Sequence, residues 1–401
     1  MKPRVGVILF IISSCISLVF LYYRRPDAFK TPQFYAEDAT IFFAQAYHEG
    51  VGSIDNIYSG YLHTYGRITA ISLEYSGIGY KHFPMLYIVA WLLPLFYSIW
   101  LLITRSGFKP LTAFLVSLLP ALMPVHTEAI LNLTNVQWIL CTCVAIIAFS
   151  KPPSHLVLRI IDLIFIFLAV TSSPVAIFLL LIFAYGRFTI KHHPAYLITA
   201  FIGTTIQIHS MIKSARYTSH SLPFDSWFLK ANRYIFNQFT YPFVGFKEIY
   251  RPDVFYYVFS FLIIVFISGI GIYLWRKKKH AGLICLFMLL STLALNIFAS
   301  IKTLQSIHPM FGNMRYFYLP SFFILMMMFF AFRETKLRLI FIPVIMIWIT
   351  CINIYVFRRM VYPDLGWEQQ AIQLQNKQKI SAPVLPGLFW KLEIDPAFHR
   401  K

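Results

Sequence analysis

Two adjacent carboxylates, Glu37 and Asp38, are the residues of this sequence best suited to chemistry. They lie in the segment Phe-Tyr-Ala-Glu-Asp-Ala at positions 34–39, shortly after the first hydrophobic stretch. The chain has 16 acidic residues against 35 basic ones, and six of the acidic residues fall between positions 24 and 80. A carboxylate acts as a general base when it lies within hydrogen-bond reach of the hydroxyl that it deprotonates, and it can also bind a metal ion. We therefore expect catalytic carboxylates in this segment. The sequence does not show whether their chemistry requires a metal ion.

The same pair also has a purely structural interpretation. Acidic residues are favoured in the first turn of a helix, because they interact with its unpaired amide groups and with its dipole. A helix is expected to begin near Ala39, so Glu37 and Asp38 can serve as its caps. The sequence does not decide between capping and catalysis, nor which carboxylate is the base.

Further polar residues that can bind a substrate lie in three other segments. His63 and Arg67 follow in the same hydrophilic stretch, and a guanidinium can donate two parallel hydrogen bonds to a phosphate. Glu128 and Asn135 belong to a polar island between two apolar runs, where polar groups are costly and often functional. Arg315 stands at the start of a later apolar run, where it can bind the phosphate of a lipid-linked molecule. In each case the alternative is a residue that faces lipid headgroups or satisfies a helix end.

The composition indicates what must position these residues. Hydrophobic residues make up 58% of the chain and charged residues 13%, against about 25% charged residues in soluble domains. Several apolar runs approach the ~20 residues that a helix needs to cross a bilayer core. The runs are continuous and do not alternate, which excludes a transmembrane β-barrel. The net charge of +19 is dispersed between these runs without any aromatic-basic motif, so we expect no nucleic-acid partner.

We predict an all-helical, polytopic membrane protein with about 11 spans. The first apolar run continues past any small-residue cleavage site, so we interpret it as an uncleaved span and not as a signal peptide. The candidate spans are residues 5–23, 83–104, 110–125, 135–150, 156–170, 173–186, 194–211, 254–275, 281–300, 317–332 and 339–357.

Residues 156–186 form either one long helix or two short ones broken at Thr-Ser-Ser-Pro, positions 171–174. With two helices, 13 basic residues of the short loops lie on one side of the membrane, and only Lys302 and Arg315 lie on the other. With a single helix, the basic loops are divided between both sides. Because cytoplasmic loops are enriched in Lys and Arg, two helices are favoured, and the proline suits the break. The N-terminus is then cytoplasmic and the C-terminus periplasmic.

We divide the chain into a transmembrane domain, residues 1–357, and a short periplasmic tail, residues 358–401. The first periplasmic loop, residues 24–82, contains two stretches with apolar residues on one face, at 36–48 and 65–75. We expect these stretches to form interfacial helices on the membrane surface. In the tail we expect a polar helix followed by a proline-bounded segment.

At these residues the chain resembles membrane glycosyltransferases of the GT-C superfamily, which carry an acidic residue or pair in the first outer loop. The segment at positions 34–39 also looks like an aromatic-Ala-Glu-Asp-Gly signature of bacterial multispan proteins of this type, with Ala39 in place of the glycine. The size and architecture are similar to those of O-antigen-modifying glucosyltransferases. Further similar pieces are residues 58–62, 132–138, 315–320 and the tail around Trp367.

The resemblance implies an enzyme of the bacterial inner membrane. It implies transfer of a sugar, with glucose favoured, from a polyprenyl-phosphate donor to a periplasm-facing glycan such as the O-antigen of lipopolysaccharide. Glu37 or Asp38 is the implied base. The partners are then the donor, a glycan or lipid-linked acceptor, and membrane lipids. No cofactor is certain, and a divalent cation is an alternative to arginine for neutralising the phosphate.

Two other classes of function stay open. A polytopic transporter or lipid-linked glycan flippase needs coupling residues at mid-membrane, and only Asp162 is a clear acid within a span, near its inner end. A glycan polymerase or ligase is similar in its number of spans, but its active loop usually comes late in the chain. The sequence does not give the sugar, the acceptor or the oligomeric state.

Overall fold

The computed structural model describes residues 3–124, 129–214, 235–243, 254–300, 314–355, 361–387 and 390–398. These residues are predominantly helical, which confirms the predicted class in its coarse form. Glu128, one of the predicted site residues, lies outside the described residues.

Among the described residues, six helices are long and apolar enough to cross a membrane, by length and composition. They lie where the hydropathy predicts spans. A continuous apolar run surrounded by lipid can satisfy its backbone hydrogen bonds within a helix, which explains this agreement. These six spans correspond to the helices α1 (Pro3–Arg24), α5 (Phe83–Thr104), α11 (Pro194–Lys213), α14 (Val254–Arg276), α15 (His280–Ser300) and α16 (Tyr318–Phe332).

Shorter helices occupy the other predicted spans. α6 and α7 are separated at Leu118, shortly before Pro120, because a proline ring and its missing N–H interrupt a helix. The figure of about 11 crossings therefore stays a prediction. The shorter helices are α6 (Pro110–Ser117), α7 (Leu119–Leu122), α8 (Val136–Phe149), α9 (Leu156–Val170), α10 (Leu179–Thr189) and α17 (Arg338–Tyr355).

The chain breaks at positions 171–174, as the charge pattern predicts. α9 ends at Val170, and the hydroxyl of Thr171 donates to the backbone carbonyl of Phe167 over 2.8 Å. A short 3₁₀ segment, η5 (Pro174–Phe178), then leads into α10. Two helices therefore stand in place of one long helix.

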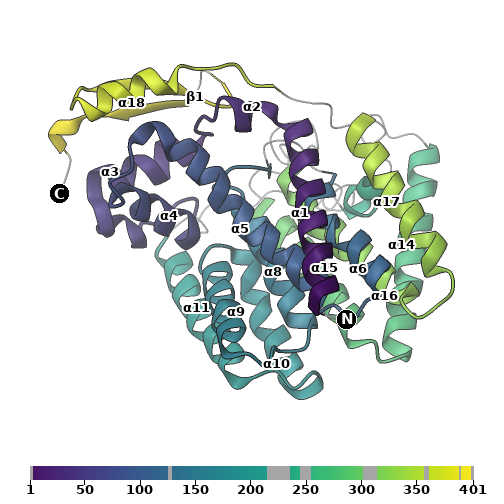
Figure 1. Cartoon of the computed structure of the whole chain (residues 1–401). Coiled ribbons are helices and arrows are strands. Elements are labelled where there is room, and N and C mark those ends of the chain that lie inside the picture. The colour runs from purple at the N-terminus through teal and green to yellow at the C-terminus, as the bar shows by residue number, and fades with distance from the viewer. Residues whose placement is uncertain are drawn as a thin grey trace.

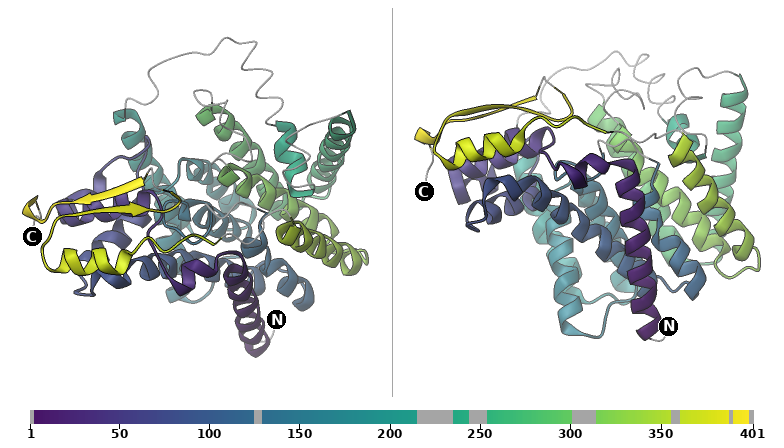
Figure 2. Two further views of the ribbon diagram at one scale, coloured as in Figure 1. Left: turned by 90° about the horizontal axis from the view of Figure 1, so that it is seen from above. Right: turned by 45° about the horizontal axis from the view of Figure 1, so that its top comes forward.

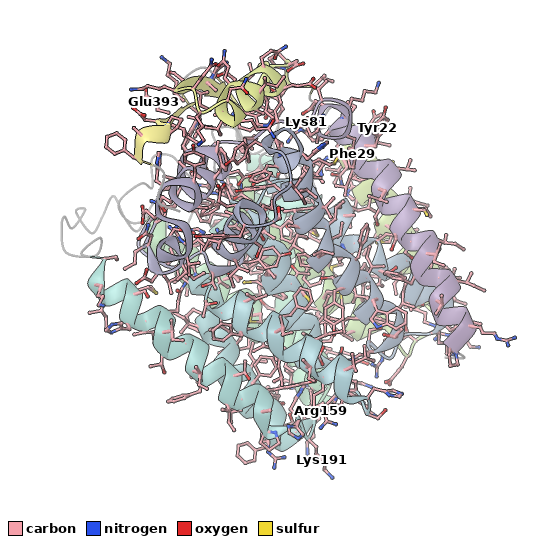
Figure 3. The ribbon with its side chains drawn as sticks, turned by 60° about the vertical axis from the view of Figure 1, so that its left-hand side comes forward. Tyr22, Phe29, Lys81, Arg159, Lys191 and Glu393 are labelled. Carbon is pink, nitrogen blue, oxygen red and sulfur yellow. The ribbon has the colours of Figure 1, made fainter. Side chains whose placement is uncertain are left out.

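The basic loops predicted to share one side of the membrane gather at one end of the helical bundle. Figure 3 shows Arg159 and Lys191 at this end, and Lys81 and Glu393 at the opposite end. We call the first the basic end and the second the loop end. Five separate loops contribute a basic residue each to a single pocket there: Arg105, Lys151, Lys191, Lys278 and Arg333.

The core of the bundle lies around α8. Every residue of α8 is buried, although the helix is flanked by polar loop residues at its start. It packs against α5, α9, α15 and α16. α16 is likewise buried from Tyr318 to Ala331. α1 lies at the side of the bundle, with its N-terminus toward the basic end (Figures 1 and 2). The helices that line the pockets described below are therefore held by the most buried part of the molecule.

The first loop forms the helices that its apolar stripes predict. The stretch 36–48 corresponds to η1 (Asp38–Phe43) and α3 (Ala44–Glu49), and the stretch 65–75 corresponds to α4 (Thr64–Glu74). η1 is π-helical. Single π-helical turns are rare and frequently occur at functional sites, so the segment with the two carboxylates is locally irregular.

The first loop and the tail pack together into one cap at the loop end (Figure 1). The expected polar helix of the tail is α18 (Trp367–Gln375). Its Trp367 ring lies 4.7 Å from the Phe34 ring and 5.9 Å from the Phe43 ring, measured between centroids. Phe34 and Phe43 also stack on each other at 5.1 Å. The apolar faces of the loop helices thus contact the tail, and their contact with a membrane surface stays a prediction.

The tail also contains a β-hairpin, which corrects the expectation of an all-helical chain. β1 (Ile380–Val384) and β2 (Trp390–Ile394) pair antiparallel, with Ala382 opposite Leu392. Alternate residues of β1 are buried and exposed, which is the two-residue period of a strand with one covered face. Pro383 is tolerated because both strands of a two-stranded sheet are edges. The first part of the proline-bounded segment is therefore a strand.

Candidate functional site

A pocket of about 130 Å³ lies at the loop end. The first loop, the start of α8, the end of α15 and the 3₁₀ segment η6 (Met314–Phe317) contribute to its lining. We call it the carboxylate pocket. Its polar lining includes Glu37, Tyr58, His63, Asn135, Gln137 and Arg315.

The pocket brings together four of the predicted site residues: Glu37, His63, Asn135 and Arg315. Two others, Asp38 and Arg67, are buried nearby in the first loop but do not line it. The four lining residues are separated by up to 278 positions in the chain, from 37 to 315. Their convergence is therefore a property of the tertiary fold.

Glu37 is the carboxylate that lines the pocket. It is half-buried, and the hydroxyl of Tyr58 donates to its Oε1 over 3.1 Å. The preceding residue, Ala36, has a φ of +40° and donates its backbone N–H to the carbonyl of Leu385 in the tail. A positive φ is uncommon for a residue with a side chain and costs about 1–3 kcal/mol. The bridge to the tail therefore helps to fix the backbone that presents Glu37.

Asp38 points into the protein and holds another loop. Its Oδ1 accepts hydrogen bonds from the backbone N–H and the hydroxyl of Thr134, both at 2.7 Å. Its Oδ2 accepts from the backbone N–H of Leu133 at 3.0 Å. Thr134 itself lines the pocket, so Asp38 lies one side chain behind it. This geometry gives Asp38 a positioning role for the segment that precedes α8.

Burial raises the pKa of Asp38 to about 7, and the charge of Glu37 adds to the rise. The three hydrogen bonds from Leu133 and Thr134 oppose it, because they favour the charged carboxylate. Burial has the larger effect, so the pKa stays above the ordinary value of an aspartate.

His63 lines the pocket as a neutral imidazole. Burial, Arg67 and Arg315 together lower its pKa to about 3, against a hydrogen bond to the backbone of Tyr58. Its Nε2 atom is buried and has no hydrogen-bond partner among the described residues. With Nδ1 bonded to a backbone carbonyl, a neutral imidazole presents Nε2 as an acceptor. Such an atom suits a hydroxyl group better than a phosphate.

Arg67 has a structural position. Its side chain donates to Gln45 Oε1 over 2.6 Å and to the backbone carbonyl of Ser53 over 2.9 Å, and it lies over the ring of Phe42. It is 1% exposed. The expectation that it binds phosphate directly is therefore not supported by its placement. It acts on the pocket through the pKa of His63.

Asn135 organises the turn that enters α8. Its backbone N–H and its Nδ2 both donate to Asn132 Oδ1 over 3.0 Å. Its own Oδ1 accepts from the indole N–H of Trp138 over 3.3 Å. The amide thereby orients Trp138, which also lines the pocket. Asn135 thus combines the predicted site position with a role in orienting Trp138, although its side chain does not cap α8.

Arg315 reaches the pocket from η6. Its guanidinium lies 5.5 Å from the centroid of the Tyr316 ring. The backbone carbonyl of Tyr316 accepts a hydrogen bond from Asn296 over 3.0 Å, and the Tyr316 ring packs edge-on against Trp138 at 5.6 Å. Aromatic rings and an amide from α15 therefore fix the segment that carries the cation.

Among the described residues, no group of three or more histidine, cysteine or acidic side chains is placed to bind a metal ion. The carboxylates nearest the pocket are Glu37 and Asp38, and the second is occupied by its three hydrogen bonds. The divalent cation considered from the sequence stays an open expectation.

Sequence reasoning missed most of the lining, including the polar residues Tyr58, Gln137 and Asn296. Tyr58 and Gln137 lie in segments that carry the resemblance, but no feature of residue type singled them out. Asn296 could have been predicted from the sequence, because a buried amide within an apolar helix is costly and often functional.

Comparison with family models, curated proteins and solved structures gives no significant match to this chain.

Proposed function

We propose that this protein is a membrane glycosyltransferase. It transfers a sugar, with glucose favoured, from a polyprenyl-phosphate donor to a periplasm-facing glycan such as O-antigen. The observation that carries the proposal is the shared pocket of Glu37 and Arg315, a carboxylate and a guanidinium at the loop end of an apolar helical bundle. In such a pair, the carboxylate can deprotonate a hydroxyl group, and the guanidinium can bind a phosphate.

Glu37 accepts the proton of the acceptor hydroxyl, and the resulting oxygen attacks the anomeric carbon of the donor sugar. A new carbon–oxygen bond forms as the bond from that carbon to the phosphate oxygen breaks. Polyprenyl phosphate leaves, and Arg315 stabilises its negative charge. Fixed charges aimed at the developing charge are often the largest catalytic contribution.

The geometry favours Glu37 over Asp38 as the base. Glu37 lines the pocket, whereas both oxygens of Asp38 are occupied by Leu133 and Thr134. Asp38 then positions Thr134 at the pocket wall. The experiment below tests whether Glu37 is the base.

His63 and the aromatic residues of the pocket support a sugar as the substrate. The Nε2 atom of His63 can accept a hydrogen bond from a sugar hydroxyl. The rings of Tyr61 and Trp138 line the same space and present apolar faces with polar edges. The C–H faces of a sugar ring pack well against such surfaces.

The proposed topology has about 11 spans in the bacterial inner membrane, with a cytoplasmic N-terminus and a periplasmic C-terminus. Under this topology the carboxylate pocket faces the periplasm. Support comes from the gathering of the basic loops at the end opposite the pocket. The donor, the acceptor and membrane lipids are the proposed partners.

A transporter or flippase is less favoured because of the position of Asp162. Its carboxylate pairs with Arg105 at 2.8 Å and also accepts hydrogen bonds from the hydroxyls of Tyr97 and Tyr196. Four groups thus form a closed network at the basic end of α9. A group that couples transport must change partners, and this acid is fully engaged.

The test is sugar transfer by the purified full chain in proteoliposomes with polyprenyl-phosphate glucose and lipid-linked O-antigen. Glu37→Gln keeps the shape of the side chain and removes the base, so turnover should fall about a hundredfold or more. Glu49→Gln is the matched control, because Glu49 is an acid of the same loop that bonds Asn56 and does not line the pocket. Transfer by Glu37→Gln at the control rate would exclude Glu37 as the base. Absence of transfer by the unaltered chain from a panel of polyprenyl-phosphate sugars would refute the enzyme class.

A further inference from the structure

A second pocket, of about 780 Å³, lies at the basic end. We call it the basic pocket. Its described lining contains no acidic residue. Outside the lining, Glu334 pairs with Lys279 and Arg333, which leaves the positive charge of the pocket only partly compensated. The six cations of the lining are Arg105, Lys151, Lys191, Lys278, Lys279 and Arg333.

Arg105 makes the pocket more than a collection of exposed loop charges. The side chain is only 10% exposed, and its Nη1 donates to both oxygens of Asp162, over 2.8 and 2.9 Å. Its Nε donates to the backbone carbonyl of Lys151 over 3.1 Å. Its Nη2 is buried without a hydrogen-bond partner among the described residues. The bonds to Asp162 and Lys151 fix the guanidinium at the wall of the pocket, where it contributes a positive charge.

Two lysines of the pocket occupy backbone positions that favour glycine. Lys191 has a φ of +62° and Lys278 a φ of +50°, just after the ends of α10 and α14. Glycine is the usual residue in this left-handed conformation after a helix, because it has no Cβ. Neither lysine forms an ion pair with any described residue. Their charge is thus retained at a conformational cost, which a bound anion would explain.

The first turn of α15 also lines the pocket, through His280, Ala281 and Gly282. The first amide groups of a helix have no partner within it and attract anions. In this pocket, these backbone amides supply hydrogen-bond donors in addition to the cationic side chains. The pocket therefore offers charge and directed donors together, which is the chemistry that binds a phosphate group.

An apolar pocket of about 370 Å³ adjoins the basic one along the same helices. Leu283 and Ile284 line it, directly after the residues of α15 that line the basic pocket. Tyr185 of α10 also lines it, and its hydroxyl hydrogen-bonds His280 Nδ1 over 2.7 Å. A polar and an apolar cavity thus meet at the Tyr185–His280 pair.

We propose that these two cavities bind one anionic phospholipid, with its phosphate headgroup in the basic pocket and an acyl chain in the apolar pocket. A lipid is the phosphate source that uses both cavities, since a soluble phosphate compound would leave the apolar one empty. Basic pockets between membrane helices commonly bind anionic headgroups. The proposal does not depend on glycosyl transfer, because the carboxylate pocket lies at the other end of α8, α15 and α16.

The test uses the full chain in a neutral detergent, stripped of native lipid, and follows thermal unfolding during titration with lipid. Cardiolipin and phosphatidylglycerol should raise the melting temperature saturably, and phosphatidylcholine should not. Glycerophosphate and inorganic pyrophosphate supply the phosphate without the chain. Equal stabilisation by phosphatidylcholine, or saturation by pyrophosphate as tight as by cardiolipin, would overturn the lipid assignment.

The decisive variant is the double substitution Lys191→Gly and Lys278→Gly. Without lipid it should melt no lower than the unaltered chain, because glycine relieves the left-handed backbone. With cardiolipin its apparent Kd should rise about tenfold or more, since two cations are lost. The matched control is Lys377→Gly, at a φ of +56° in the tail, away from the pocket. It should keep the full response to cardiolipin.

A second variant tests the acyl-chain half of the site. Leu181 lines the apolar pocket and is 56% exposed, so Leu181→Trp can fill the cavity with little strain on the core. It should weaken cardiolipin binding while leaving any weak response to glycerophosphate unchanged. Unaltered cardiolipin binding by this variant would remove the apolar pocket from the proposal, and unaltered binding by the double lysine variant would remove the basic one.

Discussion

At the residue scale, the two adjacent carboxylates separate into two environments. Glu37 precedes η1 and Asp38 is its first residue, and the two side chains have different neighbours. Glu37 faces the carboxylate pocket and Asp38 faces the loop before α8. The capping interpretation is not borne out, because η1 has no side-chain cap hydrogen bond. Asp38 instead bonds Leu133 and Thr134, and a catalytic role for Glu37 stays a proposal.

Asp38→Asn should lower the stability of the protein by about 1–3 kcal/mol, the usual penalty for a buried group without a matching partner. An asparagine can keep Oδ1 as the acceptor for Thr134, but its Nδ2 then faces the N–H of Leu133, a second donor. Thermal unfolding in detergent measures the loss. Asp55→Asn, an acid elsewhere in the same loop, is the control and should leave the melting temperature unchanged.

The pH dependence of that loss follows from the pKa of Asp38. Its pKa in the folded chain is raised to about 7 from an ordinary value of 3.8. The folded state therefore binds the proton more tightly than the unfolded state. The stability from this group is full below pH 3.8 and is lost as the pH rises through 7. Between these values the melting temperature of the unaltered chain should fall relative to that of Asp38→Asn. If the difference in melting temperature between the unaltered chain and Asp38→Asn does not change with pH, the pKa of Asp38 is not raised.

At the scale of elements, the sequence predicts helices well and the tail poorly. The apolar runs and the charge balance place every described span helix and the break at positions 171–174. Both signals are local or depend only on chain order. The hairpin itself is local, but its bridge to Tyr35 joins residues 350 positions apart in a cap held by side-chain packing. No periodicity of the sequence encodes that pairing.

The cap predicts a role for Trp367, which is 7% exposed and packs on Phe34 and Phe43. Trp367→Ala should destabilise the cap by about 3 kcal/mol or more, because it leaves a large cavity. The backbone at Ala36 then loses support, so transfer should fall although Trp367 does not line the pocket. Hydrogen exchange of residues 34–47 measures the loosening. Phe398→Ala, in the same tail but 70% exposed, should leave exchange and transfer unchanged.

At the scale of the whole molecule, the chain has two polar cavities at opposite ends of shared helices. η6 and α16 together separate Arg315 from Arg333 by 18 residues, or roughly 27 Å of helix. The buried helices between them keep the cavities apart. The sequence pointed to four lining residues of the carboxylate pocket because polar groups beside apolar runs are conspicuous. It could not separate them from Arg67, since packing in three dimensions decides which polar residue is enclosed.

The arrangement of the basic end leads to a prediction of topology. Lys151 and Lys191 lie on either side of α9 and α10 and line the same pocket. This arrangement favours a shared side of the membrane for both lysines, in which case the break at positions 171–174 divides two crossings. Reporter fusions after Lys151, Lys191 and Lys278 should be cytoplasmic, and fusions after Lys30, Lys213 and Phe398 should be periplasmic. A fusion after Ser172 should also be periplasmic. Reporters after Lys151 and Lys191 on opposite sides would contradict both the paired crossings and the positive-inside assignment on which the membrane orientation rests.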